Sequence, residues 1–286
     1  MIDTSKKPEW LKKKINLSEE ITSTERLIEK LGLNTVCEGA LCPNRNECFT
    51  NKTATFMILG NNCTRNCRFC AVTKGKPEQL NLNEPLLVGE AAKLLGLKHI
   101  VVTSVTRDDL EDGGARHFAH TVVEIRNQNP EATIELLIPD LQGNWEALKI
   151  IIDAQPNILN HNLETVPSLY PVVRPEANYH RSLELLNRTK ELNPYMITKS
   201  GIMVGLGENE EEIVSLMDDL REINVDMLTI GQYLSPSQEH LKVVEYIRPE
   251  QFDKYSAIGY KKGFKHVSSG VFVRSSYHAD EGIKVF

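Results

Sequence analysis

Long apolar runs are absent from this sequence of 286 residues. No run approaches the roughly 20 apolar residues that a membrane-spanning helix needs. The first residues are polar and rich in lysine, unlike a signal peptide. An excess of positive charge is also absent, because the net charge is −6, and this argues against a nucleic-acid binder. We therefore expect a cytoplasmic protein that binds neither membrane nor nucleic acid.

Cysteine is missing from most of the chain. All 6 cysteines lie between Cys37 and Cys70. Cysteines that serve as small buried apolar residues would be scattered through the core, whereas this clustering indicates ligands. A disulfide framework is not expected, because a reducing cytosol favours metal binding or catalysis.

The second triad, Cys63, Cys67 and Cys70, has the spacing Cys-x3-Cys-x2-Cys. It follows an apolar run at 54–60 that predicts a buried strand opening into a loop. Three thiolates can hold three irons of a cubane iron–sulfur cluster and leave one iron open to a small molecule. Zinc is a weaker interpretation, because zinc usually takes a fourth protein ligand.

The first triad, Cys37, Cys42 and Cys48, has the spacing Cys-x4-Cys-x5-Cys. Neither spacing is typical of a zinc knuckle. Two triads predict two clusters. The alternative is one site that shares all six thiolates, and such a site would leave no open iron.

Strand and helix patterns alternate from residue 53 onward, which predicts parallel βαβ units. We expect an α/β fold, a partial (β/α)6 TIM-like barrel, with its site at the carboxyl ends of the strands. Expected strands cover 54–59, 98–104, 133–138, 158–162, 201–204, 227–232 and, in the tail, 270–273. Expected helices cover 25–31, 88–95, 115–127, 143–153, 179–192, 209–222 and 250–262. The expected divisions are an N-terminal extension (1–52), the barrel (53–234) and a C-terminal extension (235–286), with both extensions covering the barrel mouth.

Polar stretches follow several expected strands, at 103–114, 160–165, 201–208 and 232–236. Each alone could be an ordinary turn, since Asn, Asp and Gly favour turns. Together they would surround one barrel mouth. The stretch 201–208 is also similar to a phosphate loop, but no Lys-Ser/Thr follows it.

The second triad, with Phe69 before Cys70, resembles the signature of the radical S-adenosylmethionine (SAM) superfamily. This resemblance implies that Cys63, Cys67 and Cys70 hold a catalytic 4Fe–4S cluster whose open iron binds SAM and cleaves it to a 5′-deoxyadenosyl radical. The resemblance also implies that 201–208 packs beside the adenine of SAM. The implied SAM-binding residues are Phe69, Ser104, Asn162, Glu164, Arg174, Met203 and Gly205.

The two triads, together with Arg-Ser-Ser-Tyr at 274–277, resemble the lipoyl synthase family. The stretches 53–60, 107–114 and 160–164 fit the same family. The resemblance implies that the first triad binds an auxiliary 4Fe–4S cluster with a catalytic serine as fourth ligand, assigned to Ser276 with Ser275 as the fallback. It also implies insertion of two sulfur atoms, drawn from the auxiliary cluster, at carbons 6 and 8 of a protein-bound octanoyl-lysine.

The same resemblance implies protein partners. These are an octanoylated lipoyl carrier (a dehydrogenase E2 lipoyl domain or the glycine cleavage H protein), an electron donor such as ferredoxin or flavodoxin, and a cluster carrier that restores the auxiliary cluster. Charge complementarity with an acidic carrier makes Lys6, Lys7 and 12–14 the candidate docking residues.

Other functions stay open at the level of sequence. One is a different radical SAM enzyme that inserts sulfur or methylthio groups. Another is a metal- or cluster-binding protein without catalysis. A third is an iron–sulfur electron carrier, although that function predicts four cysteines for each cluster.

Overall fold

The computed structural model describes residues 7–12, 19–50 and 54–286. Three of the candidate docking lysines, Lys6, Lys13 and Lys14, lie outside the described residues, as does Thr53 at the start of the expected barrel. None of the described helices is long and apolar enough to cross a membrane.

One eight-stranded sheet, in the order β1 to β8, forms the centre of the fold. The strands β2 to β8 pair in parallel, whereas β1 pairs antiparallel with β2. The strands are β1 (Asn34–Thr35), β2 (Thr55–Ile58), β3 (His99–Ser104), β4 (Thr133–Leu137), β5 (Ile158–Asn160), β6 (Ile197–Val204), β7 (Met227–Gln232) and β8 (His266–Gly270). The expected α/β fold with parallel strands is confirmed.

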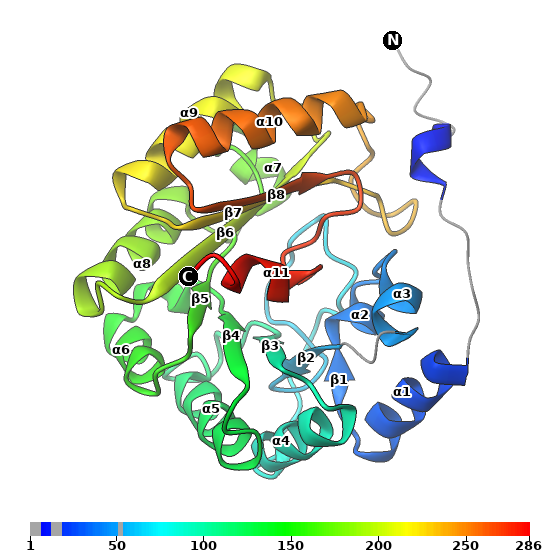
Figure 1. Ribbon diagram of the computed structural model, residues 1–286, viewed down its shortest axis with the longest axis vertical. Coiled ribbons are helices and arrows are strands. Elements are labelled where there is room, and N and C mark those ends of the chain that lie inside the picture. The colour runs from blue at the N-terminus through cyan, green and yellow to red at the C-terminus, as the bar shows by residue number, and fades with distance from the viewer. Residues whose placement is uncertain (1–6, 13–18, 51–53) are drawn as a thin grey trace.

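Helices surround this sheet, which curves into an open barrel with β1 and β8 at its two edges (Figure 1). The outer helices are α4 (Glu84–Leu95), α5 (Ala115–Gln128), α6 (Trp145–Asp153), α8 (Tyr179–Leu192), α9 (Glu210–Glu222) and α10 (Pro249–Lys262). The remaining helices are α1 (Glu19–Lys30), α2 (Val36–Gly39), α3 (Arg45–Thr50), α7 (Tyr170–Val173) and α11 (Ala279–Ile283), with short 3-10 turns at Glu9–Leu11, Leu141–Gly143 and Pro167–Leu169.

Local sequence explains where these elements begin and why the strands are buried. Strands covered by helices outside and by side chains inside read as near-continuous apolar runs, and β2 is buried along its whole length. The helix α9 starts with a capping box, in which the Asn209 side chain accepts a hydrogen bond from the Glu212 amide and the Glu212 side chain accepts one from the Asn209 amide.

The predicted strand at 270–273 is wrong. The strand β8 covers His266–Gly270, where Gly270 pairs with Gly231 of β7, and the chain turns at 271–272. The sequence His-Val-Ser-Ser-Gly has little apolar character, so its place in the sheet was missed. The prediction placed the strand instead on the apolar side chains that follow, Val271, Phe272 and Val273. The barrel therefore has one more parallel strand than the six expected.

After β8 the chain turns back into the barrel. A Cβ on Gly231 of β7 would lie 2.1 Å from the carbonyl oxygen of Val273, so only glycine lets the two backbones approach this closely. The helix α11 contacts β3 and β8 and lies in the middle of the ring of strands in Figure 1. Ala279 and Gly282 of this helix are buried, and Gly282 packs against Met227 and His266 at the starts of β7 and β8, whereas the last three residues of the chain are exposed.

A buried ion pair crosses the barrel interior. Lys199 Nζ of β6 lies 2.9 and 3.1 Å from the two carboxylate oxygens of Glu135 on β4. Asn160 Nδ2 donates to Glu135 Oε1 at 3.0 Å, and His99 Nε2 lies 3.4 Å from Oε2. Burial alone would raise the pKa of Glu135, but the charge of Lys199 and the bond from His99 lower it to about 2.

We expect Lys199→Met to destabilise the fold by about 3 to 5 kcal/mol at pH 7, because it leaves the Glu135 carboxylate buried without its cation. The free energy of urea unfolding measures this loss. Lys149→Met, at an exposed lysine of α6 paired with Asp153, is the matched control and should leave the free energy of unfolding close to that of the parent.

The same substitution predicts a pH dependence. A carboxyl group whose pKa is lower in the folded state than in the unfolded state stabilises the fold at pH values above its unfolded-state pKa. This contribution is lost as the pH falls from the unfolded-state pKa toward the folded-state pKa. For Glu135 that window runs from 4.5 down to about 2. The stability difference between the parent and Lys199→Met should therefore shrink below pH 4.5. A difference that stays constant across this window would contradict the prediction.

Candidate active site

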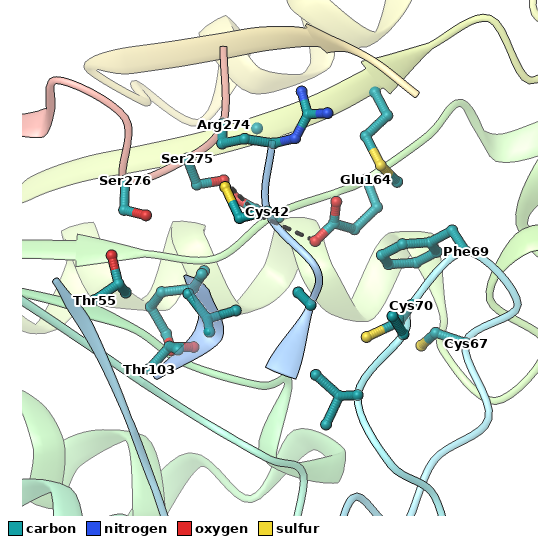
Figure 2. Close-up of a pocket in the computed structure, with 18 of the residues that line it drawn as sticks. Cys42, Thr55, Cys67, Phe69, Cys70, Thr103, Glu164, Arg274, Ser275 and Ser276 are labelled. Carbon is teal, nitrogen blue, oxygen red and sulfur yellow. Dashed lines mark hydrogen bonds between the residues drawn. The ribbon is translucent and has the colours of Figure 1, made fainter. Parts of the chain in front are cut away.

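One cavity of about 480 Å³ contains both cysteine triads. All six cysteines, Ser275 and Ser276 line it, and so do the carboxyl ends of several strands. Figure 2 shows Cys67, Cys70 and Phe69 on one side of this pocket and Cys42 with the two serines on the other. The tertiary structure therefore brings together segments from the beginning, the middle and the end of the chain.

The second triad lies on the loop that follows β2. The Cys63 amide donates to Thr73 O at 2.8 Å, and the Gly75 amide donates to Cys63 O at 3.1 Å, so the loop closes on itself. The Arg68 amide donates to Val173 O at 3.0 Å. Such backbone bonds fix the loop before any ligand binds.

Arg65, between Cys63 and Cys67, ties this loop to the barrel. Its guanidinium forms two hydrogen bonds to Asp108, at 2.7 and 2.9 Å, and lies 2.6 Å from Asp140 Oδ1. Burial alone would raise the pKa of Asp140, but the hydrogen bond from Arg65 helps to lower it to about 2. Arg65 thus joins the cysteine loop to the loops after β3 and β4.

Burial favours the protonated form of two thiols in the second triad, Cys67 and Cys70. The amides of Arg65 and Thr106 lie 3.5 and 3.4 Å from Cys63 Sγ, and hydrogen bonds to sulfur tune the potential of a cluster. Burial raises the pKa of the Cys70 thiol to about 12. Burial also raises the pKa of Cys67, against the opposing charge of Arg174. Iron binding must therefore displace protons from these thiols.

The first triad lies on α2, on α3 and on the turn between them. Thr35 caps α2, because its side chain accepts a hydrogen bond from the Glu38 amide. Cys37 on α2 is buried, and burial raises its pKa to about 11. Cys42 lies in the turn, and Cys48 lies on α3.

The two serines differ in their surroundings. Asn162 Nδ2 donates to Ser275 Oγ at 2.7 Å. Within the described part of the chain, Ser276 Oγ has no hydrogen-bond partner, although it lines the same cavity. Of the two serines, Ser276 therefore has the hydroxyl group that is free to contact a bound group in the cavity.

Six of the seven residues expected to bind SAM line the cavity, namely Phe69, Ser104, Asn162, Glu164, Arg174 and Met203. Three buried polar atoms among them, Ser104 Oγ, Asn162 Oδ1 and Arg174 Nε, have no hydrogen-bond partner among the described residues. A buried polar group without a partner costs about 1 to 3 kcal/mol. A polar molecule bound here, such as SAM, fits these orphaned atoms.

Gly205 is the exception, because it does not line the cavity. A Cβ at this position would lie 2.3 Å from Gln232 Nε2 and 2.4 Å from the carbonyl oxygen of Glu245. The glycine allows the loop at 245 to pack against the ends of β6 and β7. Its place in the structure is explained by this packing.

Glu164 sits in a strained and buried position at the cavity wall. Its φ of 66° lies in the left-handed region, which costs a residue other than glycine about 1 to 3 kcal/mol and is frequent at functional sites. Asn162 Nδ2 donates to Glu164 Oε1 at 3.0 Å. Burial raises the pKa of Glu164, against the opposing charges of Arg174 and Arg274.

Sequence reasoning missed Arg65 and Arg274. The position of Arg65 between Cys63 and Cys67 was visible in the sequence, but its partners Asp108 and Asp140 are distant in sequence. Arg274 donates to its own neighbour, Val273 O, at 2.6 Å, and its charge acts on Cys42 and Glu164. Its position before the serine pair was the one available signal.

The donor sets fit iron–sulfur clusters. Each triad offers three thiols, the soft ligands that such clusters take. Within the described ranges, no three His, Cys, Asp or Glu side chains are gathered closely enough to hold a single metal ion. The triads are thus not arranged around one ion each.

Comparison with known proteins first defines the class. The family model described as the radical SAM superfamily matches residues 57–220. A crystal structure of methylornithine synthase (PylB) shares the fold, with a TM-score of 0.52 at 15% identity, covering 92% of this chain and 82% of that one. Streptococcus suis SuiB, bound to SAM, gives a TM-score of 0.59 at 10% identity and covers 79% of this chain and 53% of that one. The chain is a radical SAM enzyme.

Sequence relatives then define the family. A lipoyl synthase of Caldanaerobacter subterraneus subsp. tengcongensis is 60% identical over 282 residues, which cover 99% of both chains. One of Geobacillus sp. is 57% identical over 279 residues, covering 97% of this chain and 94% of that protein. This chain belongs to the lipoyl synthase family, whose cofactors are SAM and 4Fe–4S clusters.

The Arg65 contacts predict how firmly the second triad holds iron. We expect Arg65→Gln to lose half of the bound iron to a chelator about 10 to 100 times faster than the parent, because supporting contacts around metal ligands have effects of this size. Arg68→Gln, at an exposed position of the same loop, is the matched control. Iron release is followed by absorbance under anaerobic conditions. Equal release rates for the two variants would contradict the prediction.

Proposed function

We propose that this enzyme inserts two sulfur atoms at carbons 6 and 8 of a protein-bound N6-octanoyl-lysine, which yields the lipoyl group. The observation that supports this most directly is that both triads and the serine pair line one cavity. When bound, the cluster and SAM at the second triad supply a 5′-deoxyadenosyl radical, and the auxiliary cluster at the first triad supplies sulfur.

In this proposal the residues of the chain bind and orient the clusters, SAM and the octanoyl chain, and they do not transfer protons. The carbons that react have no activating group, so acid–base catalysis has no means of removing their hydrogens. Cys63, Cys67 and Cys70 hold one cluster. Apolar side chains that fit an alkyl chain also line the cavity, among them Val36, Met57, Val72, Leu137 and Ile138.

Polar groups on the other walls suit SAM. Ser104, Asn162 and Arg174 carry the orphaned atoms described above, and Glu164 adds a buried carboxyl group. Phe69 and Met203 supply apolar contacts in the same cavity. We assign these six residues to SAM binding. Gly205 does not line the cavity and instead allows the close packing of Gln232 and Glu245 at the ends of β6 and β7.

Cys37, Cys42, Cys48 and Ser276 are the proposed ligands of the auxiliary cluster. The bond from Asn162 to Ser275 supports Ser276 over Ser275 as the oxygen ligand, because it engages the Ser275 hydroxyl. A serine oxygen is harder than a thiolate and is poorly matched to iron–sulfur chemistry. Ser276 is therefore the ligand that is most easily given up.

The octanoyl-lysine arrives on a carrier, either a dehydrogenase E2 lipoyl domain or the glycine cleavage H protein. Two features support docking at the rim of this cavity. Lys7 lines the cavity and suits an acidic carrier, and Leu41, beside Cys42, is 66% exposed. We further propose a reductant such as ferredoxin or flavodoxin, a cluster carrier that restores the auxiliary cluster, and a cytoplasmic location.

An assay with an octanoyl-lysine peptide tests the proposed division of labour. Reconstituted enzyme with SAM and a reductant should yield a peptide that has gained two sulfur atoms, as seen by mass spectrometry. Cys42→Ala should still cleave SAM but lower the yield of sulfur-containing product by about 100-fold, whereas Cys67→Ala should abolish SAM cleavage as well. Cys42→Ala with parent-level product would refute the sulfur-donor role of the first triad.

A thiolate in place of the oxygen ligand tests the role of Ser276. We expect Ser276→Cys to retain the auxiliary iron more firmly than the parent and to lower product formation by about 10-fold or more, because a thiolate matches iron better and leaves less readily. Ser275→Ala is the comparison at the neighbouring hydroxyl and should leave the auxiliary iron in place. Full activity in Ser276→Cys would count against a ligand that must leave.

A further inference from the structure

The segment that carries Ser276 comes from the opposite end of the chain to the first triad. Residues 272–277, here called the serine segment, follow β8 and lie outside any helix or strand. A loop without regular structure has no ladder of hydrogen bonds to fix its place. The position of the Ser276 hydroxyl at the first triad therefore depends on individual contacts.

Two hydrogen bonds join the serine segment to the first triad, one on each side of Ser276. On one side, Asn44 Nδ2 donates to Phe272 O at 2.7 Å. On the other side, Tyr277 Oη donates to Glu47 Oε1 at 2.7 Å. The pairs are separated by 228 and 230 residues in sequence.

The two residues that hold the serine segment lie within the stretch that carries the first triad, Asn44 in the turn before α3 and Glu47 on α3. Asn44 lies between Cys42 and Cys48, and Glu47 directly precedes Cys48. Asn44 is buried, with 1% of its surface exposed, so its amide must be hydrogen-bonded within the protein. Any shift of the ligand cysteines is therefore transmitted to the backbone on both sides of Ser276.

The barrel wall fixes the middle of the serine segment. The close contact between Gly231 and Val273 O holds the backbone against β7, and Ser275 Oγ is held by Asn162. Between this wall contact and the Tyr277 bond, Ser276 has little freedom in its backbone. Its hydroxyl can change position by rotation of its own side chain.

We propose that Asn44 and Glu47, with Tyr277, are positioning residues that hold the backbone on both sides of Ser276 at the first triad. This inference rests on the proposed ligand role of Ser276. The backbone stays in place whether or not the hydroxyl is a ligand, so the serine that is given up remains near the cysteines. Arg45, between these two residues, is instead paired with Glu25 and Glu38.

The test uses the full chain carrying Cys63→Ala, Cys67→Ala and Cys70→Ala, which leaves only the first triad to bind iron. The chain is reconstituted with iron-57, and Mössbauer spectra distinguish an iron with an oxygen ligand from irons with thiolate ligands. In this background we compare Asn44→Ala, Tyr277→Phe and the pair combined. Tyr277→Phe keeps the aromatic ring and removes only the hydroxyl.

We expect each single variant to weaken the signal of the oxygen-liganded iron and the combined variant to lose it. Release of that iron to a chelator should become about 10 times faster or more. Glu47→Gln still offers an oxygen acceptor to Tyr277, and its spectrum should stay close to that of the parent. Tyr195→Phe, at a tyrosine that is 95% exposed, controls for loss of a phenol elsewhere.

Thermal unfolding of each variant shows whether a changed spectrum comes from loss of the fold or from displacement of Ser276 in a folded protein. If Asn44→Ala does not fold, Tyr277→Phe carries the test and Glu47→Gln remains its control. Ser276→Ala separates the two proposals. If Ser276→Ala leaves the spectrum unchanged, the ligand role itself fails. If Ser276→Ala removes the oxygen-liganded iron while Asn44→Ala and Tyr277→Phe keep the parent spectrum and release rate, only the positioning role is overturned.

Discussion

The interior of the barrel is defined by one close approach between two backbones. The carbonyl oxygen of Val273 occupies the space that a side chain on Gly231 would fill. Because Gly231 has no side chain, the chain can turn inward after β8 and place its serines in the cavity. The packing of α11, the serine pair and the wall opposite the second triad all follow from that turn.

Buried charges in this protein divide into two groups. The pairs Lys199–Glu135 and Arg65–Asp108 are closed, since each charge has a counter-charge at hydrogen-bond distance. Removing one partner from such a pair leaves an uncompensated charge. These pairs support the barrel and the cysteine loop.

The second group faces the cavity. Glu164 is buried in a strained backbone conformation, and Arg274 makes its hydrogen bond to a neighbouring carbonyl oxygen. Buried titratable groups with shifted pKa values are frequent at functional sites. Arg65 also lines the cavity, so the two groups differ in whether each charge has a close counter-charge and not in their distance from the site.

Much of the fold could be predicted from sequence because most strands from β2 to β7 contain a short apolar run and alternate with helical patterns. The first half of β6 was missed, because Thr198, Lys199 and Ser200 interrupt its apolar character. The strand β8 could not be predicted, because His266 and the two serines in it give no apolar alternation. Its place is set by pairing with β7. The partners of Arg65 were also beyond prediction, since Asp108 and Asp140 reach it only when the loops after β3 and β4 come together.

The sequence by itself predicted which cysteines act together, because the spacing of cysteines within a short stretch is a local property of the chain. Tertiary structure alone decided that the two triads share a cavity, and that Ser275 is hydrogen-bonded to Asn162 while Ser276 is not. These relations depend on how the two ends of the chain meet inside the barrel. Such contacts between residues distant in sequence leave no periodic or spacing signal in the chain.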